Sequence, residues 1–241
     1  MSLAQRRREE ELLDVLPASD PRAQRSRRDL RRVNVLMGQR FILRQNLQAL
    51  FSASAPRRII EIGAGDGTLM LSLARSLAGR WPGVTVTLVD RHPIVSPATL
   101  TAFSQLGWRT ECVTADAIPW FQQGHPADLA VANLVLHHFD EPPLRKLFAA
   151  IARTTEVFVA TEPRRSSTAL MGSRALALIG CNEISRHDAV VSVRAGFNGR
   201  ELSALWPAGN DWQLTERRAG LFTHLFVARQ GGQLREKRRD L

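Results

Sequence analysis

The sequence predicts an α/β fold, in which a mostly parallel sheet carries helices on both faces. Between residues 57 and 162, short apolar runs alternate with longer segments of helical periodicity. The links between these segments are short, as is typical of repeated β–α units. Apolar residues make up 44% of the 241 residues, which is enough for one domain with a sizeable core.

The first 50 residues are expected to form a helical extension that precedes the sheet. Residues 1–16 are predicted to be a short charged helix, which Pro17 and Pro21 end. Between residues 22 and 50, apolar side chains recur at steps of three and four, which predicts helix with one buried face. Gly38 is expected to break this helix.

The alternating units follow in order along the chain. We expect strands at 58–62, 84–90, 109–116, 128–136 and 156–162. Helices are expected at 67–79, 97–107 and 141–153; Gly79 is a natural C-cap for the first of them. Residues 163–200 interrupt this rhythm. A helix at 199–206 follows, and residues 211–230 are predicted to be two strands joined through Ala219 and Gly220 as a β-hairpin.

The positive charge of the chain lies mostly at its ends. The net charge is +10, and residues 1–44 hold 11 arginines against 6 acidic residues. Such ends leave nucleic acid phosphates or an anionic membrane surface open as partners. No run of 18 uncharged apolar residues and no secretory signal is seen, so no membrane-spanning segment is expected. Cys112 and Cys181 are far apart and outside metal-ligand spacing, which favours free thiols, a cytoplasmic location and no metal site.

A glycine-rich stretch, Gly63-Ala-Gly65-Asp-Gly67, comes directly after the first predicted strand. In a parallel sheet, ligands bind beyond the carboxyl ends of the strands, so this turn is the first place to look for a site. The dinucleotide fingerprint GxGxxG would need a third glycine where Thr68 stands. Glu61 and Asp66 would repel a pyrophosphate, whereas an adenosine ligand with an amine and a sulfonium would be attracted.

This stretch resembles the first motif of the class I S-adenosylmethionine-dependent methyltransferases, an acidic residue followed by xGxGxG. Three further segments match in order: "TLVDRHP" with Asp90, "VTADAIPW" with Asp116, and "ANLVLHHF". The resemblance covers about residues 30–229. It implies a Rossmann-like, seven-stranded, mostly parallel sheet with helices on both faces, a C-terminal β-hairpin, an N-terminal helical extension and a helical lid insertion.

The same resemblance implies domain boundaries and a cofactor. Residues 1–50 would cover the cofactor site, residues 51–230 would form the methyltransferase domain with its lid at 163–200, and the basic tail 231–241 is predicted to be disordered. The cofactor would be S-adenosylmethionine and the product S-adenosylhomocysteine. The residues expected to bind it are Met37, Arg40, Glu61, Gly63, Gly65, Gly67, Asp90, Arg91, Asp116, Ala117, Ile118 and Asn133.

Individual roles follow from the resemblance as well. Asp90 would hold both ribose hydroxyls and Asp116 would lie near the adenine amino group, although either residue could merely cap the next helix. The stretch "VNVLMGQRFILRQNL" looks like the first helix of the ubiquinone and menaquinone biosynthesis methyltransferases. That likeness makes Arg40 a candidate partner for the methionine carboxylate, which suits its planar fork, unless Arg40 is only a solvated helix residue.

The acceptor side of the site has three candidate general bases. His137 and His138 follow the fourth strand beside the methyl donor, and His187 lies in the lid next to Asp188. Neighbours in sequence diverge, so at most one of the pair is expected to face the acceptor, and Asp188 is not expected to orient His187. Met171, Arg194 and Phe197 are predicted to contact the acceptor. We expect a small hydrophobic aromatic acceptor, such as a phenol, a quinol or a polyketide-like ring, that is methylated on oxygen, with carbon and nitrogen also open.

Two other functions are open. A nucleic acid methyltransferase is disfavoured, because "NLVLHH" stands where base amino-methylation uses an Asn/Asp-Pro-Pro-aromatic motif, and neither cysteine is placed as a nucleophile. A non-catalytic binding module is disfavoured by the intact cofactor positions. A homodimer built through the N-terminal helix is also open.

Overall fold

A single mixed sheet organises the chain. The computed structural model describes residues 3–17, 19–209 and 211–231. Within them, seven strands follow the order β3-β2-β1-β4-β5-β7-β6. They are β1 (Arg58–Ile62), β2 (Thr85–Asp90), β3 (Arg109–Thr114), β4 (Ala127–Asn133), β5 (Thr155–Pro163), β6 (Trp212–Ala219) and β7 (Thr223–Gln230). The first five pair in parallel, while β7 is antiparallel to β5 and β6. The predicted parallel sheet and C-terminal hairpin are confirmed.

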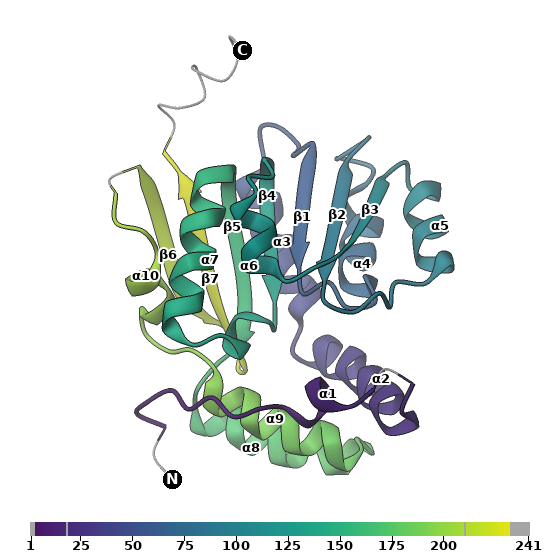
Figure 1. The fold of residues 1–241 in the computed structure, drawn as a ribbon, viewed down its shortest axis with the longest axis vertical. Helices are drawn as coiled ribbons and strands as arrows, with labels where there is room; N and C mark the ends of the chain where they lie inside the picture. Colours follow the sequence, from purple (N-terminus) through teal and green to yellow (C-terminus); the bar gives the residue numbers. More distant parts are fainter. Residues whose placement is uncertain (1–2, 18, 210, 232–241) are drawn as a thin grey trace.

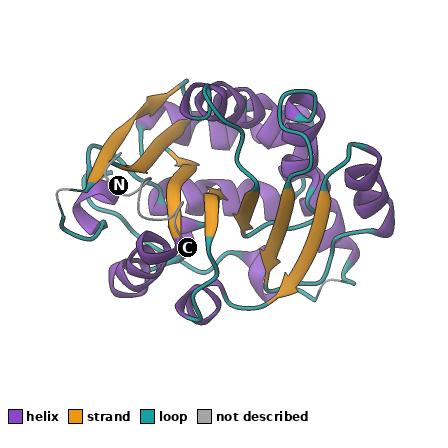
Figure 2. Ribbon diagram, turned by 90° about the horizontal axis from the view of Figure 1, so that it is seen from above, coloured by secondary structure: helices purple, strands orange, loops and turns teal. Residues whose placement is uncertain are grey.

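Helices cover both faces of the sheet (Figure 2). On one face lie α3 (Gln39–Leu50), α4 (Thr68–Leu77) and α5 (Pro97–Gln105), which bury Leu43, Met70 and Phe103 in one hydrophobic cluster. On the other lie α6 (Ala117–Gln122), α7 (Glu141–Thr154) and α10 (Glu201–Leu205), which bury Phe121, Leu144 and Leu202 in a second cluster. Because both its faces are covered, β4 reads as a continuous apolar run instead of an alternating one.

A further layer of helices lies across the carboxyl ends of the parallel strands, at the bottom of Figure 1. It joins two distant parts of the sequence. The N-terminal part gives α1 (Leu12–Val15) and α2 (Pro21–Leu36); the insertion after β5 gives α8 (Ser167–Ala175), η2 (Leu176–Ile179) and α9 (Glu183–Ala195). Gly38, with φ of +69°, separates α2 from α3, as the sequence predicted. The extension and the insertion together form this cap layer.

Several predicted boundaries are wrong. Residues 1–16 are not one helix: of the described ones, 12–15 are helical, and the residues before them run along α9 (Figure 1). β4 ends at Asn133, because Leu136–His138 form a 3-10 turn, η1. β3 ends at Thr114, and Asp116 caps α6, a helix absent from the expected series. The predicted disordered tail lies, apart from Gly231, outside the described residues.

Candidate active site

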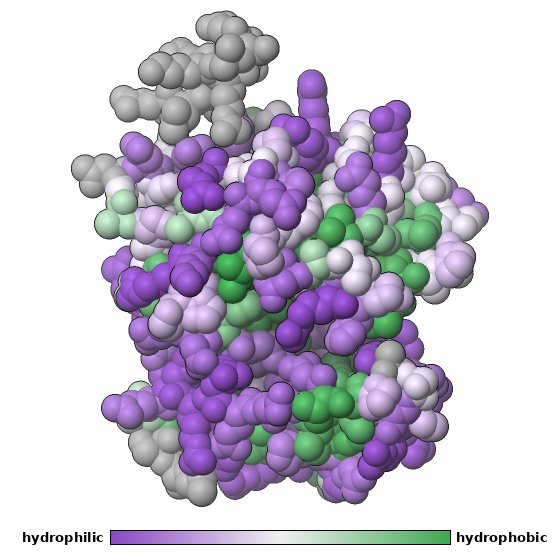
Figure 3. All heavy atoms as spheres, in the orientation of Figure 1, coloured by the Kyte–Doolittle hydropathy of each residue, from purple (hydrophilic) through white to green (hydrophobic). Residues whose placement is uncertain are grey.

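A cavity of about 770 Å³ lies between the sheet and the cap layer, within the range typical of small-molecule sites. Its floor is formed by the ends of four parallel strands and the turns after them. Its roof is formed by α1, α2, α8, η2 and α9. The apolar lining includes Leu30, Val33, Leu36, Met37, Ala169, Leu176, Ile179, Val193 and Phe222. Figure 3 shows hydrophobic side chains gathered low on the right, where α1 and α2 lie.

The glycine loop lines the floor of this cavity and depends on glycine at each of its three positions. Gly63, Gly65 and Gly67 have φ of +66°, +55° and +72°, a region that L side chains rarely adopt. A Cβ on Gly63 would lie 2.7 Å from Cγ2 of Val135, whereas nothing lies within 4 Å of one on Gly65. The backbone of Gly65 is therefore open to close approach by a ligand.

The two later acids of the predicted cofactor site line the same cavity. Asp90, the last residue of β2, accepts hydrogen bonds from the backbone N–H of Gly65 and of His92, each 2.8 Å long. Asp116 accepts the N–H of Ile118 at 2.9 Å and so caps α6 while it also lines the cavity. The capping and the ligand-binding interpretations of Asp116 are thus compatible.

Glu61 has a buried carboxyl oxygen without a hydrogen-bond partner in the part of the chain that the structure describes. Its side chain lines the cavity, yet the residue is only 2% exposed. Burial, with the charges of Asp66 and Asp90 nearby, raises the pKa of Glu61 well above its usual value. Among the described residues, no hydrogen-bond partner lies near its Oε2. A buried carboxyl oxygen without a partner is costly, so a cationic ligand group at this place would relieve it.

Most of the other predicted cofactor residues also line the cavity, but Gly67, Arg40 and Ile118 do not. Met37, Arg91, Ala117 and Asn133 are among the lining residues. Ile118 is instead packed against the second hydrophobic cluster.

Arg40 needs a correction, because Gly38 turns α3 away from the cavity. Arg40 is exposed, and its Nη1 reaches Oγ of Ser72 on α4 at 3.3 Å. Arg27 and Arg31, one turn apart on α2, line the cavity in its place, and Arg31 binds Asp66 at 2.8 Å. The helical spacing of Arg27, Leu30, Arg31 and Asn34 was the signal that sequence reasoning missed.

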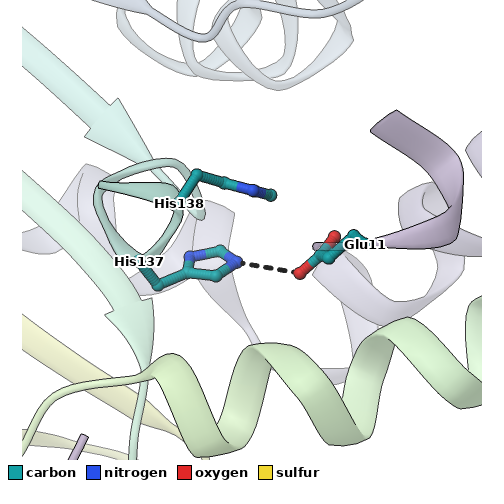
Figure 4. Close-up of side chains that lie close together, drawn as sticks. All are labelled: Glu11, His137 and His138. Carbon is teal, nitrogen blue, oxygen red and sulfur yellow. Dashed lines mark hydrogen bonds and ion pairs between the residues drawn. The ribbon is translucent and has the colours of Figure 1, made fainter. Parts of the chain in front are cut away.

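His137 lies between two buried carboxylates on the floor of the cavity, and Figure 4 shows one of them, that of Glu11. Its Nδ1 lies 2.7 Å from Glu162 and its Nε2 lies 3.3 Å from Glu11. Burial alone would lower the pKa of His137, but the hydrogen bonds and charges of Glu11 and Glu162 outweigh it and raise that pKa to about 9. His137 is therefore an imidazolium at neutral pH. Glu162 also accepts the N–H groups of Val135, Leu136 and His137, which fixes η1.

His138 is placed differently from its neighbour. Its Nδ1 lies 3.2 Å from Oδ2 of Asp14, and its side chain is 24% exposed. The two imidazole rings lie 4.2 Å apart at 36°. Burial alone would raise the pKa of Asp14. The hydrogen bond and charge of His138, together with the charge of Arg91, outweigh this effect and lower that pKa. Both His138 and Asp14 line the cavity.

Glu11, His137 and His138 each place one potential ligand atom within 4.8 Å of the others, a spacing that a metal ion could bridge. Ion pairs among them and with Asp14 and Glu162 already account for this arrangement.

The third predicted base, His187, is half exposed and is not among the lining residues. Contrary to the expectation, Asp188 does contact it: Nδ1 of His187 lies 3.1 Å from Oδ1 of Asp188. Asp188 itself is 5% exposed and lines the cavity.

The three predicted acceptor contacts also lie away from the cavity lining. Met171 is 71% exposed, because it lies on the outer side of α8. Phe197 is fully buried in the second hydrophobic cluster, under the guanidinium of Arg6 at 4.4 Å. Arg194 is absent from the cavity lining, and its backbone carbonyl accepts the N–H of Arg7. Small residues of the same insertion, such as Ala169, Gly172, Ser173 and Ala189, line the cavity instead.

Comparisons with known proteins agree with this geometry. Residues 60–156 match the family model of a methyltransferase domain. No curated protein sequence matches the chain. Among solved structures, the chain is similar to the plantazolicin methyltransferase BpumL in complex with SAH, with a TM-score of 0.64 and 13% identity over 88% of this chain and 91% of that one.

Two further structures have the same fold. One is an O-methyltransferase family protein from Burkholderia thailandensis, with a TM-score of 0.61 and 20% identity over 90% of this chain. The other is the pyocyanin biosynthetic protein PhzM, with a TM-score of 0.56 and 16% identity over 92% of this chain. This chain covers 62% of each of those two.

Residues 60–156 therefore match a methyltransferase domain, and the described chain has the fold of solved methyltransferases. Both findings support a class I S-adenosylmethionine-dependent methyltransferase. Among the described residues, no helix combines the length and the hydropathy that crossing a membrane would require.

Proposed function

We propose that this enzyme transfers the methyl group of S-adenosylmethionine to a hydroxyl of a small, apolar, aromatic acceptor. The observation that carries the proposal is that one cavity is lined both by the glycine loop with its acids and by the His138–Asp14 pair. Apolar side chains of α2, α8 and η2 line the same cavity. Both cysteines are free, which fits the reducing cytoplasm that we propose as its location.

The cofactor would lie on the glycine loop. Asp90 would accept hydrogen bonds from the ribose hydroxyls, and Asp116 would lie at the adenine amino group. Glu61, buried and without a partner at Oε2, would receive the cationic amine of the methionine part. The methionine carboxylate would be bound by Arg31 or Arg27, which both line the cavity, and not by Arg40, the candidate that the family resemblance suggested.

Methyl transfer is an in-line displacement at carbon. The acceptor oxygen forms its bond to the methyl carbon as the C–S bond breaks, and the electron pair of that bond stays on sulfur. The acceptor proton goes to a base. His137 is a poor base, since its pKa of about 9 keeps it protonated. In His138, Nδ1 faces Asp14, which leaves Nε2 to accept the proton.

The cofactor assignment is tested by calorimetry with S-adenosylmethionine and S-adenosylhomocysteine. Asp90→Ala should weaken both affinities by at least about tenfold, because charge-assisted hydrogen bonds are lost. Glu111→Ala removes an exposed carboxylate from β3 and should leave both affinities unchanged. Unchanged affinity in Asp90→Ala, or binding of NAD in place of these ligands, would count against the assignment.

The acceptor assignment is tested by a turnover screen on phenols, quinols, aryl amines and aryl carboxylates. We expect the phenols and quinols to be methylated. His138→Ala should lower kcat on the best of them by about a hundredfold or more, as for loss of a general base. Tight cofactor binding without turnover of any acceptor would instead favour a non-catalytic binding module. Methylation of RNA or DNA alone would favour the nucleic acid alternative.

A further inference from the structure

The N-terminal segment of residues 3–15, called the N-terminal strap here, is tied to the rest of the chain by hydrogen bonds. Arg6 donates from Nε to the carbonyl of Ala195 at 2.6 Å, and from Nη2 to the carbonyls of His137 and Phe139 at 2.9 and 2.8 Å. The backbone N–H of Arg7 donates to Arg194 at 3.1 Å. These contacts hold the strap against α9 and η1, where Figure 1 shows it crossing the cap layer.

Asp188 holds the part of the strap that lies just before Asp14. It projects from α9, and its two carboxylate oxygens accept the backbone N–H groups of Leu12 at 2.8 Å and Leu13 at 3.0 Å. Both bonds fix the turn of chain between Glu11 and Asp14. The group is 5% exposed, so water competes little for these bonds.

The residues on either side of this turn reach the two histidines of the floor. Glu11 contacts Nε2 of His137 and accepts a hydrogen bond from the hydroxyl of Ser192 on α9. Asp14 contacts Nδ1 of His138. A carboxylate at Nδ1 fixes the tautomer and the ring plane of a histidine base, so the place of Asp14 decides whether His138 can act.

We propose that Asp188 is a positioning residue of the active site: by holding Leu12 and Leu13, it places Asp14 against His138 and thereby completes the general base. The inference rests on the proposed function for the role of His138. It goes beyond that function in making the N-terminal strap part of the site. The sheet domain alone supplies His138 but lacks Asp14, the carboxylate that orients it. Asp188 acts through Asp14, although it also lines the cavity.

The kinetic test compares Asp188→Ala with Asp14→Asn and with their combination. We expect kcat to fall by between about tenfold and a thousandfold in each single variant, with the affinity for S-adenosylhomocysteine within about twofold of the parent. The kcat of the double variant should be no lower than that of the more impaired single variant, because both changes disrupt the same contact between Asp14 and His138. Glu183→Ala, which removes an exposed carboxylate from the start of α9, is the matched control and should keep the parent kcat.

A spectroscopic test does not depend on any acceptor. In the complex with S-adenosylhomocysteine, ¹⁵N NMR of the His138 ring reports which nitrogen carries the proton. The parent and Glu183→Ala should show the Nδ1–H form, and Asp188→Ala and Asp14→Asn should both show a mixture of tautomers. If the parent enzyme methylates no acceptor, the proposed function is contradicted. The tautomer of His138 can still be measured, so the inference is tested separately.

The inference would be overturned by a kcat of Asp188→Ala within twofold of the parent, by losses that multiply in the double variant, or by a His138 tautomer that Asp188→Ala leaves unchanged. An equal loss of cofactor affinity in Asp188→Ala would also overturn it, since that would indicate a general disturbance of the cap layer.

Discussion

Folding strongly changes the environment of His137. Glu162 and Glu11 face it on two sides, the ring of His138 stacks beside it, and Ser192 bonds to Glu11. The pKa of His137 rises from 6.5 to about 9 in the folded protein. A group whose pKa is raised by folding stabilises the protein below its unfolded pKa, and this contribution is lost as the pH rises through the folded value.

We therefore predict that the free energy of unfolding falls between pH 6.5 and about pH 9.5. The fall attributable to His137 is about 3.5 kcal/mol at most, from about 1.4 kcal/mol for each unit of pKa shift. Urea unfolding at several pH values measures it. Glu11→Gln removes one of the two carboxylates, so its pH dependence should be shallower. Parallel curves for the parent and for Glu11→Gln would show that the ion pair contributes nothing.

At the scale of elements, the two halves of the cap layer are joined through a buried carboxylate of α2. Asp29 is 2% exposed, and its Oδ2 accepts the N–H of Asn182 at 2.9 Å and the hydroxyl of Ser185 at 3.1 Å. Ser26 and Ser185 add a hydroxyl contact of 2.9 Å. The start of α9 is thus held by the helix that lines the cavity from the other side.

Asp29→Ala should release α2 from α9 and cost about 1–3 kcal/mol of unfolding free energy, because a buried N–H loses its acceptor. Affinity for S-adenosylhomocysteine should fall too, since α2 carries lining residues such as Leu30 and Asn34. Hydrogen exchange of the α2 and α9 amides is the measurement. Asp20→Ala is the matched control: it removes the N-cap of α2 and its ion pair with Arg22, costs about 1 kcal/mol, and should leave α9 protected. Equal exchange in both variants would contradict this coupling.

The elements of the sheet could be predicted from the sequence, because apolar periodicity and short links are local signals. The cofactor half of the candidate site was predictable for the same reason: Gly63, Asp90 and Asp116 each lie directly at the end of a strand. The acceptor half was not. Its geometry depends on contacts between residues far apart in sequence, such as Asp14 with His138 and Leu12 with Asp188.

The N-terminal strap illustrates this limit. Its mixed charges and leucines suggested a helix, but Arg6 finds three backbone acceptors on α9 and η1 and the chain there runs extended. No local sequence pattern predicts that these distant backbone carbonyls accept hydrogen bonds from Arg6. Phe197 was misassigned for a related reason, since an aromatic residue in an apolar insertion can face the core or a cavity equally well.

At the scale of the whole molecule, the cavity is the boundary between two layers with separate hydrophobic contacts. The sheet and its flanking helices hold the two large clusters. The N-terminal strap links the cap layer to them. Arg165, which follows β5, donates a hydrogen bond from Nε to the carbonyl of Leu3 in this strap at 2.9 Å. A ligand that fills the cavity touches both layers, so its binding free energy should stabilise the molecule as one unit.

We predict that S-adenosylhomocysteine at a hundred times its dissociation constant stabilises the protein by about 2.7 kcal/mol. For a chain of this size, that corresponds to a rise in Tm of about 5–10 °C. Thermal unfolding followed by circular dichroism measures it, and hydrogen exchange should show added protection in α2 and α9 as well as in the glycine loop. Asp90→Ala should lose the rise, and NAD at the same concentration should give none, because Glu61 and Asp66 oppose a pyrophosphate. Protection confined to the glycine loop would mean that the cap layer does not close on the cofactor.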